Sequence, residues 1–361
     1  PPSGFLALCE DNLPTPAIAD PGEHFKCVLY TGDGDKGRNI TGVGFKPDLV
    51  WIKSRSFSNN HHLFDVVRGP NRILRPSSTD AETIPGNIMP SFNTDGFTVG
   101  EDGSNNATND NGNTFVAWCW KAGGAATANT DGSINSSVSV NQTAGFSIVS
   151  YTSNGTSGAT VGHRLNKTPS FIIVKMRSSQ SVGSANWAVY HKSLGATKNM
   201  WLDSSNGENT SADYWNNTEP TSSVFSLGND LDTNHTNGYD YIAYCWTEIE
   251  GYSKFGSYTG NGDADGPFVY CGFKPAWVMI KRTDAANQWQ IQDTSRNSTN
   301  PTNAALYAEA SSAEEIATST SKDFVSNGFK IRGVDAMVNA SGGSYIFMAF
   351  AESPFQTANA K

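Results

Sequence analysis

The sequence predicts an all-β protein of three tandem β-sandwich, jelly-roll-like domains, with short irregular or helical turns. Three observations support this fold class: one strand motif occurs three times, turns rich in Gly and Asn recur throughout, and helix signals are scarce. Of the 361 residues, 35 are Gly, 11% are aromatic and only 16% are charged. This composition is typical of short strands that surround cores of large rings and are joined by many turns.

The repeated motif is a Lys, a Pro and a run of mostly apolar β-formers closed by a second Lys. It occupies residues 46–53, 167–175 and 274–281. The first two motif prolines are 122 residues apart and the next two are 106 apart. Self-similarity at one long period indicates tandem units, and a period of about 100 residues suits a complete β-sandwich. We expect Lys53 to mark the point where its strand leaves the core for solvent.

Each motif copy follows an aromatic strand with a Gly-rich turn and precedes a closing aromatic strand. The motif strand carries apolar residues on both faces, which predicts a strand that is covered on both sides. The best helix signals are short, at residues 304–310 and 312–316. The expected organisation is an extended leader or linker from a preceding domain at 1–23, sandwich repeats at 24–122, 145–250 and 251–355, a linker at 123–144 with an extra strand near 136–140, and a tail at 356–361.

Charge and hydropathy argue against two classes of partner. The formal net charge is -9 and the sequence pI is about 5.1. No run of Lys and Arg forms a basic stripe, so no nucleic-acid partner is expected. No apolar run approaches the ~18 residues of a membrane-spanning helix, so membrane insertion is not expected. The chain begins with Pro-Pro and no Met, which is typical of a fragment or a trimmed product.

The five cysteines are odd in number and fit a structural role. Cys119 and Cys245 hold the same place in their closing strands, where the third repeat has Ala349. A position that accepts Ala in an apolar strand is a small core filler, and neither a metal ligand nor half of a disulfide. Cys27 also falls in a predicted strand. We therefore expect free thiols made in a reducing cytoplasm, and no cofactor.

One Gly-rich turn in the third repeat resembles the opening of a calcium-binding loop. Asn261, Asp263 and Asp265 place oxygen-bearing side chains at alternate positions. The bidentate Glu that such a loop needs is missing, because Gly272 occupies its place. The corresponding turns of the other repeats look like hairpin turns, in which Asn, Asp and Gly supply positive φ. The turn interpretation is favoured and calcium is the alternative.

His61, His62 and Asp65 form a second candidate metal cluster. Adjacent strand residues point to opposite faces, so the two imidazoles are badly placed to bind one ion. Asp65 is followed three residues later by an Arg, and so is Asp293, which favours a local ion pair at a strand end. No Ser-His-Asp order, phosphate loop or Cys-x-x-Cys spacing occurs, so no enzyme is expected. Scattered carboxylates could still meet in space as a glycosidase pair.

Aromatic residues in polar loops are the stronger binding signal. Tyr214 and Trp215 lie in a loop rich in Asn, Thr and Ser that has no aromatic counterpart in the first repeat, and Trp201 precedes that loop. Rings exposed in loops stack on sugar faces, so these three are the expected ligand-binding residues. The alternative is that each ring caps the core of its own sandwich. That alternative is favoured for Trp187 and Trp289, which hold matching positions.

Taken together, the repeated motifs resemble a known family. Residues 258–262 are Tyr-Thr-Gly-Asn-Gly, residues 272–281 begin Gly-Phe-Lys-Pro and end in Lys, and residues 241–246 end in Tyr-Cys-Trp. This order is similar to a repeat family of β-sandwich units in virion proteins, fibres and appendages, of marine tailed bacteriophages. The resemblance covers about residues 1–355, and residues 165–169 depart from its pattern. It supplies no catalytic residue to carry over.

This resemblance implies a non-enzymatic virion protein, assembled in the host cytoplasm, that acts as a tail fibre or host-attachment appendage and binds host-surface glycan through loops. A capsid decoration protein or structural head fibre is the alternative, and a glycan-degrading tailspike is less favoured. The expected partners are other virion proteins, host-surface polysaccharide and, by analogy with fibres, further copies of this chain in a homotrimer.

Overall fold

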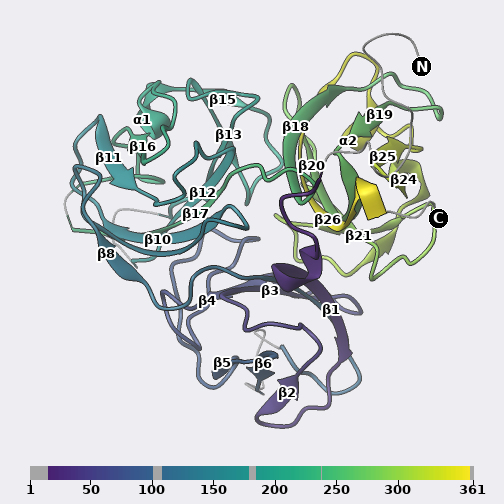
Figure 1. The fold of residues 1–361 in the computed structure, drawn as a ribbon, viewed down its shortest axis with the longest axis horizontal. Coiled ribbons are helices and arrows are strands. Elements are labelled where there is room, and N and C mark those ends of the chain that lie inside the picture. The colour runs from purple at the N-terminus through teal and green to yellow at the C-terminus, as the bar shows by residue number, and fades with distance from the viewer. Residues whose placement is uncertain (1–14, 101–107, 179–183, 237, 358–361) are drawn as a thin grey trace.

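The computed structural model describes residues 15–100, 108–178, 184–236 and 238–357. It is nearly all β, as predicted, and consists of antiparallel sheets packed as sandwiches. Each sequence repeat forms one large and one small sheet. Figure 1 shows the three pairs around a common centre, with the large sheets facing inward and the small sheets outside. No helix within these ranges is long and apolar enough to cross a membrane.

The first repeat has a four-stranded sheet in the order β1-β7-β3-β4 and a three-stranded sheet in the order β2-β6-β5. The motif strand β3 lies between the closing strand β7 and β4, and a 3-10 turn, η2 (Pro21–Glu23), precedes β1. The strands are β1 (Phe25–Thr31), β2 (Arg38–Ile40), β3 (Leu49–Ser54), β4 (His62–Asp65), β5 (Ser91–Asn93), β6 (Gly96–Val99) and β7 (Thr114–Trp120).

The second repeat has eight strands in its large sheet, in the order β15-β14-β13-β12-β17-β10-β9-β8, and two in its small sheet, β11-β16. The expected linker at 123–144 is corrected here, because its β8 and β9 extend the large sheet; the extra strand near 136–140 is confirmed as β9. The elements are β8 (Thr127–Asn129), β9 (Ser136–Asn141), β10 (Phe146–Thr152), β11 (Ala159–Gly162), β12 (Phe171–Met176), β13 (Ala188–His191), β14 (Lys198–Trp201), β15 (Asn209–Thr210), α1 (Ala212–Trp215), β16 (Val224–Leu227) and β17 (Asp240–Trp246).

The third repeat has a six-stranded sheet in the order β18-β26-β20-β21-β22-β23 and a three-stranded sheet in the order β19-β25-β24. The helix signals at 304–310 and 312–316 are wrong: the two segments contain strands β22 and β23, because β22 pairs with β21 and β23 pairs with β22, and this pairing overrides helix propensity. The elements are β18 (Ser253–Thr259), β19 (Phe268–Tyr270), β20 (Phe273–Arg282), β21 (Gln290–Asp293), β22 (Ala304–Tyr307), β23 (Glu315–Ile316), η3 (Thr318–Thr320), β24 (Lys322–Val325), β25 (Gly328–Ile331), α2 (Ala336–Asn339), β26 (Ser344–Pro354) and η4 (Phe355–Thr357).

Alternate residues of each closing strand point into two different cores, one on each face of the large sheet. Cys119 pairs with Val50, and its equivalents Cys245 and Ala349 hold the same register beside β12 and β20. All three are fully buried between the large and small sheets of their own repeats. The prediction that Cys119 and Cys245 are core fillers is therefore confirmed.

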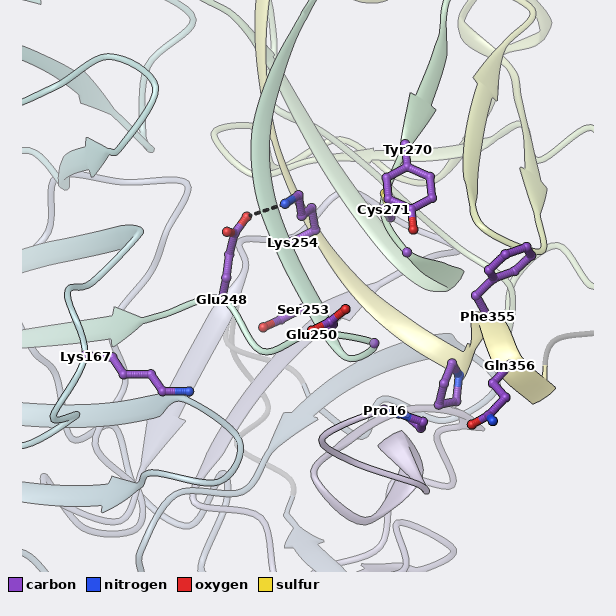
Figure 2. A pocket seen from close by; sticks show the side chains of 13 residues that line it. Pro16, Lys167, Glu248, Glu250, Ser253, Lys254, Tyr270, Cys271, Phe355 and Gln356 are labelled. Carbon is purple, nitrogen blue, oxygen red and sulfur yellow. Dashed lines mark ion pairs between the residues drawn. The ribbon is translucent and has the colours of Figure 1, made fainter. Parts of the chain in front are cut away.

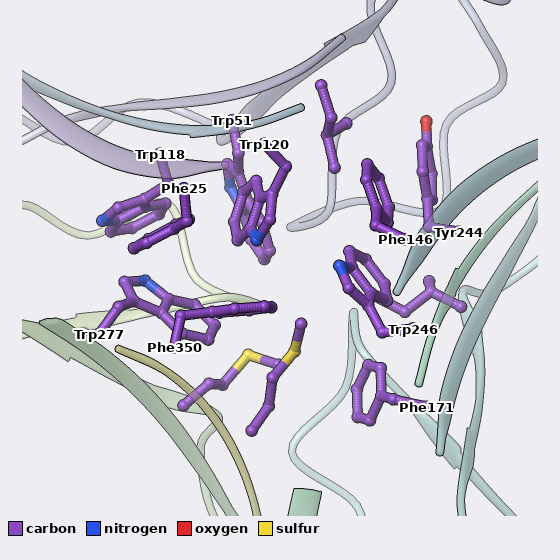
Figure 3. Close-up of a cluster of buried hydrophobic side chains, with 14 of the residues drawn as sticks. Phe25, Trp51, Trp118, Trp120, Phe146, Phe171, Tyr244, Trp246, Trp277 and Phe350 are labelled. Atoms are coloured by element: carbon purple, nitrogen blue, oxygen red, sulfur yellow. The ribbon is translucent and has the colours of Figure 1, made fainter. Parts of the chain in front are cut away.

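The opposite face of each large sheet contributes to one core shared by all three repeats. Figure 3 shows its centre, where rings from β7, β17 and β26 meet. The ring centroid of Trp120 lies 6.3 Å from that of Trp246 and 5.6 Å from that of Phe350. The motif strands are thus buried on both faces, as their sequence predicted. Aromatic contacts at such distances stabilise the core beyond the area that they bury.

The lysine that closes each motif is buried, whereas the sequence predicted that Lys53 leads its strand into solvent. Lys53 is fully buried and does not lead into solvent; its Nζ donates to Ser54 O and, in the third repeat, to Ser311 O, at 2.9 and 3.2 Å. Each of its equivalents likewise reaches a carbonyl in a neighbouring repeat: Lys175 donates to Thr79 O, and Lys281 to Ser205 O, both at 2.9 Å.

Burial lowers the pKa of these three ammonium groups, because a charged group loses hydration in the protein interior. The pKa of Lys53 falls to about 7, and those of Lys175 and Lys281 fall to about 8. The amine still donates hydrogen bonds after it loses the proton. The folded protein therefore releases these protons at a lower pH than the unfolded chain does.

The contribution of these three lysines to the free energy of unfolding should consequently rise between about pH 7 and 10. In this window they bind more protons in the unfolded chain than in the folded one, since unfolded lysines titrate near 10.4, and each contributes at most about 1.4 kcal/mol per pH unit. Lys53→Met should remove the share of the slope that Lys53 contributes, whereas the exposed Lys46, changed to Met, should leave the slope unchanged. Urea unfolding across this range measures both. Equal slopes in both variants would contradict the assignment.

Trp120→Ala should lower the free energy of unfolding by about 3–5 kcal/mol, because it opens a cavity in the shared core. All three repeats should still unfold in one calorimetric transition, since each loses contacts to this ring. Ile84→Ala, at a side chain that is 59% exposed, is the control and should have little effect. Separate transitions for the three repeats would show that the shared core does not couple them.

Candidate functional site

The candidate functional site is a pocket of about 430 Å³ where the second repeat joins the third. The connection between β17 and β18 forms its floor and β19, β26 and η4 form its far side (Figure 2). Lys167, from the turn before β12, reaches towards it from the second repeat. Two lysines and two glutamates line it, so their formal charges balance: Lys167, Lys254, Glu248 and Glu250.

Glu248 is held between two ammonium groups. Its Oε2 lies 2.6 Å from Lys192 Nζ and its Oε1 lies 3.2 Å from Lys254 Nζ, the contact drawn in Figure 2. Oε1 also accepts the Phe255 N–H at 3.1 Å. Burial works to raise the pKa of Glu248, but the lysines and the N–H outweigh it, so that pKa lies below its ordinary value. The carboxylate is therefore ionised at neutral pH and fixed in position.

Tyr270 is the exposed aromatic residue of this pocket. Its side chain is 57% exposed, and its hydroxyl end lies beside Gly272. Gly272 has φ of +81°, which favours glycine, and its open surface lets the ring lie close to the backbone. Phe268, two residues earlier on the same face of β19, is 48% exposed. An exposed ring beside fixed charges can stack on an apolar ligand face while polar groups bind its edge.

Two reactive side chains of the pocket, Cys271 and Glu248, are poorly suited to catalysis, and its polar groups can form hydrogen bonds to a ligand. Burial raises the pKa of the Cys271 thiol, so it stays protonated and is a poor nucleophile. Glu248, with its lowered pKa, is unsuited to act as a general acid near neutral pH. The lysines, the glutamates and the Gln356 amide together offer donors and acceptors around a ring, which suits an uncharged, hydroxyl-rich ligand.

The aromatic loop that was expected to bind ligand is not exposed in the structure. Tyr214 and Trp215 are buried, and Trp201 is half-buried with its Nε1 donating to Asp232 Oδ2 at 3.0 Å. The segment forms the helical turn α1, whose N-cap Ser211 turns both rings inward against the large sheet. These residues do not form an open stacking surface, because the alternative considered for them, capping the core, is the arrangement observed.

The calcium candidate is a turn. The side-chain oxygens of Asn261 and Asp263 each accept the backbone N–H two residues later, at 2.9 and 2.8 Å. Asp265 pairs with Lys330 at 2.7 Å, and the buried Asn339 amide donates to Asp263 O at 2.7 Å. The oxygens that calcium would need are thus used by the turn. No group of three or more His, Cys, Asp or Glu that could hold a metal occurs in the described ranges.

The His61 cluster has a structural role. Nδ1 of His61 accepts the Trp51 Nε1–H at 2.7 Å and its Nε2 lies 2.9 Å from Tyr307 O, so both ring nitrogens are occupied. The predicted ion pairs at the strand ends are confirmed, with N–O distances of 2.5 Å for Asp65 and 2.6 Å for Asp293. The core assignment of the two matching tryptophans is confirmed by their full burial: Trp187 and Trp289.

Tyr270 was not predicted from the sequence, although an alignment of the repeats by strand register indicates it. Val269 pairs with Phe329 as Ile40 pairs with Phe97, so Phe268 and Tyr270 correspond to residues 39 and 41. Those positions are Asn and Thr in the first repeat. Polar residues on the outside of a small sheet are the ordinary case, and two aromatic replacements there indicate a contact surface.

Comparison with known proteins gives one match. The family described as "Domain of unknown function (DUF7483)" matches residues 20–354. No curated protein and no solved structure matches the chain. The matched span includes nearly all of the three repeats and most of the residues that line the pocket. The chain belongs to the DUF7483 family.

Proposed function

We propose that this chain is a non-enzymatic bacteriophage virion protein, a tail fibre or host-attachment appendage, that binds host-surface glycan in the pocket beside Tyr270. The observation that carries the proposal is the exposed ring of Tyr270 next to a charge-balanced set of polar side chains. The virion location rests on the resemblance of the repeated motifs to phage fibre and appendage proteins. Its partners are then other virion proteins and host polysaccharide.

Sugar recognition asks for this combination of groups. A pyranose presents an apolar face of C–H groups and a rim of hydroxyls that both donate and accept hydrogen bonds. Tyr270 supplies a ring for the face, while Glu248 and Lys254 supply an acceptor and a donor for the rim. The Lys192–Glu248–Lys254 chain fixes these groups before ligand binds, which reduces the entropy lost on binding.

The ionised state of Glu248 favours glycan binding without hydrolysis. Retaining and inverting glycosidases need a protonated carboxyl group close to a second carboxylate. Glu248 carries no proton near neutral pH, because two lysines hold its pKa down. We accordingly propose binding without turnover, and not a glycan-degrading tailspike.

Capsid decoration is the second candidate function, favoured by the neighbouring side chains on β19. Phe268 and Tyr270 are both exposed on one face of that strand, and a paired apolar surface is typical of a protein contact. Under this alternative the two rings would be buried against the shell. The two functions make different demands on Phe268, because it lies outside the pocket.

Tyr270→Ala should weaken binding of polysaccharide from susceptible host cells by about tenfold, or ~1.4 kcal/mol, because the stacking ring is lost. Phe268→Ala is the matched control and should bind glycan normally. Isothermal titration and glycan arrays measure this. Equal loss in both variants, with reduced attachment to capsids, would favour decoration; wild-type affinity in Tyr270→Ala would remove the pocket from consideration.

Immunogold labelling of intact particles should place the protein at the tail or fibre tips. Label over the capsid would favour decoration, and no label on any particle would contradict the virion assignment.

Incubation with host polysaccharide should release no oligosaccharide; release that Glu248→Gln abolishes would show a hydrolase. Light scattering would determine whether three copies of the chain associate, as the fibre analogy proposes.

A further inference from the structure

A glutamate at each of the three interfaces between repeats makes the same backbone hydrogen bond. Its N–H donates to the carbonyl of the residue two positions after the buried motif lysine of the neighbouring repeat. The three glutamates are therefore structurally equivalent, and their surroundings can be compared directly within one chain. The bonds run from Glu82 to Arg177 and from Glu314 to Arg55, both at 2.9 Å, and from Glu208 to Thr283 at 2.7 Å.

Between the first and second repeats, three guanidinium groups surround Glu82. Arg177 donates through Nε and Nη2 to the two carboxylate oxygens, both at 3.1 Å. Arg68 Nη1 donates at 3.2 Å and Arg72 Nη1 at 2.8 Å. The Glu82 side chain is 9% exposed. Burial works to raise its pKa, but the arginines outweigh burial and hold the pKa below its ordinary value.

Between the third and first repeats, two guanidinium groups surround Glu314 in the same way. Arg55 donates through Nε and Nη2 at 2.9 and 2.8 Å, and Arg296 Nη1 donates at 3.1 Å. The Glu314 side chain is 11% exposed. A planar fork on a carboxylate is the strongest common form of such a pair. Two of the three interfaces are thus closed by a bidentate arginine from the neighbouring repeat and a second arginine from the same repeat.

Between the second and third repeats, both of these arginines are replaced. Thr283 stands where the other interfaces have the bidentate arginine, and Leu194 stands where they have the second one. In the part of the chain that the structure describes, Lys198 is the one side chain that pairs with Glu208. Lys198 corresponds to Arg72 in the first repeat. At Glu82 the Arg72 contact leaves room for two further guanidinium groups, so Lys198 does not occupy the place of the missing arginines. The Glu208 side chain is 26% exposed.

A groove of about 380 Å³ opens where the two arginines are missing. Leu194 and Thr283 line it together with Glu208 and its partner Lys198, and the half-buried Tyr258 adds ring surface. Asp284, which pairs with Arg282 at 2.8 Å, places a second carboxylate at the groove. The groove thus places the Glu208 carboxylate, whose one side-chain partner among the described residues is Lys198, beside a tyrosine ring.

We propose that this groove binds a guanidinium group, with Glu208 accepting its two parallel N–H donors. The structure itself supplies the template, because equivalent carboxylates hold guanidinium groups at the other two interfaces. The group would come from an arginine side chain of a partner protein or from a small guanidinium compound. An ammonium ion fits less well, since it is a point charge without the planar fork and is more strongly hydrated. The proposal is independent of glycan binding in the pocket beside Tyr270.

N-acetyl-arginine amide should bind to the intact chain and shift the NMR methyl signals of Leu194, with affinity in the millimolar range that is typical of a single exposed ion pair. N-acetyl-lysine amide should bind at least about fivefold more weakly. Glu208→Gln should weaken binding of the arginine probe at least about tenfold, because the charged acceptor is removed. Equal binding of the two probes, or no binding of the arginine probe, would overturn the proposal.

Thr283→Arg provides the sharper test. The new side chain starts from the same backbone position as Arg177 and Arg55, so it should occupy the groove, abolish probe binding and raise the melting temperature. Thr283→Val, which leaves the groove open, is the matched control and should bind the probe as the native chain does. Wild-type binding in Thr283→Arg, with folding verified by its melting curve, would overturn the proposal.

The source of the guanidinium group is distinguished by a third probe, an acetylated Gly-Gly-Arg-Gly-Gly amide. Tighter binding of this peptide than of N-acetyl-arginine amide would identify a protein segment as the occupant. Equal affinity would identify a small guanidinium compound. In either case, probe binding should be lost in Glu208→Gln and in Thr283→Arg. Binding that survives both changes would show that the probe binds elsewhere and would overturn the proposal.

Discussion

The architecture depends on large sheets that must be covered on both faces. Along a closing strand, Cys119 points into the sandwich of its own repeat while Trp120 points into the core that all three repeats share. A repeat on its own would expose a complete aromatic sheet face to water, at about 25 cal/mol for each Å² of apolar surface. The repeats therefore resemble the units of a repeat protein, which need their neighbours to complete a core. The small sheets cover the outer side of each large sheet, so the shared core lies at the centre of the molecule.

Apolar contact is non-directional and cannot by itself fix how three sheets are rotated about their common core. The directional contacts lie around that core. Each buried motif lysine donates to a carbonyl of a neighbouring repeat, and each interface adds a glutamate N–H bonded to a carbonyl across the joint. A hydrogen bond from a buried amine needs a narrow geometry. These bonds explain why three sequences that differ widely elsewhere keep a Lys at the end of the motif strand.

Sequence alone predicted what local pattern determines. The repeat, the strands, the turn at Asn261, the ion pairs at the strand ends and the burial of Cys119 all follow from residue order within one repeat. The misses share a different origin. Lys53 looked like a strand exit because the loop that accepts its hydrogen bond belongs to another repeat. Trp215 looked exposed because its neighbours are polar, yet a capped helical turn rotates it inward. Residues 304–307 and 315–316 lie in segments of helix-forming composition and become strands because a strand is available beside each to pair with.

Departures from the equivalence of the three repeats indicate where to look for function in this fold. Residues that hold three equivalent positions are explained by the shared architecture, so departures from equivalence need another reason. Several departures lie in or beside the third repeat: the rings of β19 replace polar residues, and Thr283 and Leu194 replace the two arginines that close the other interfaces. Both the pocket beside Tyr270 and the groove at Glu208 lie between the second and third repeats. Two interfaces are closed by buried arginine–glutamate pairs, and both proposed ligand sites lie at the third interface, which lacks these arginines.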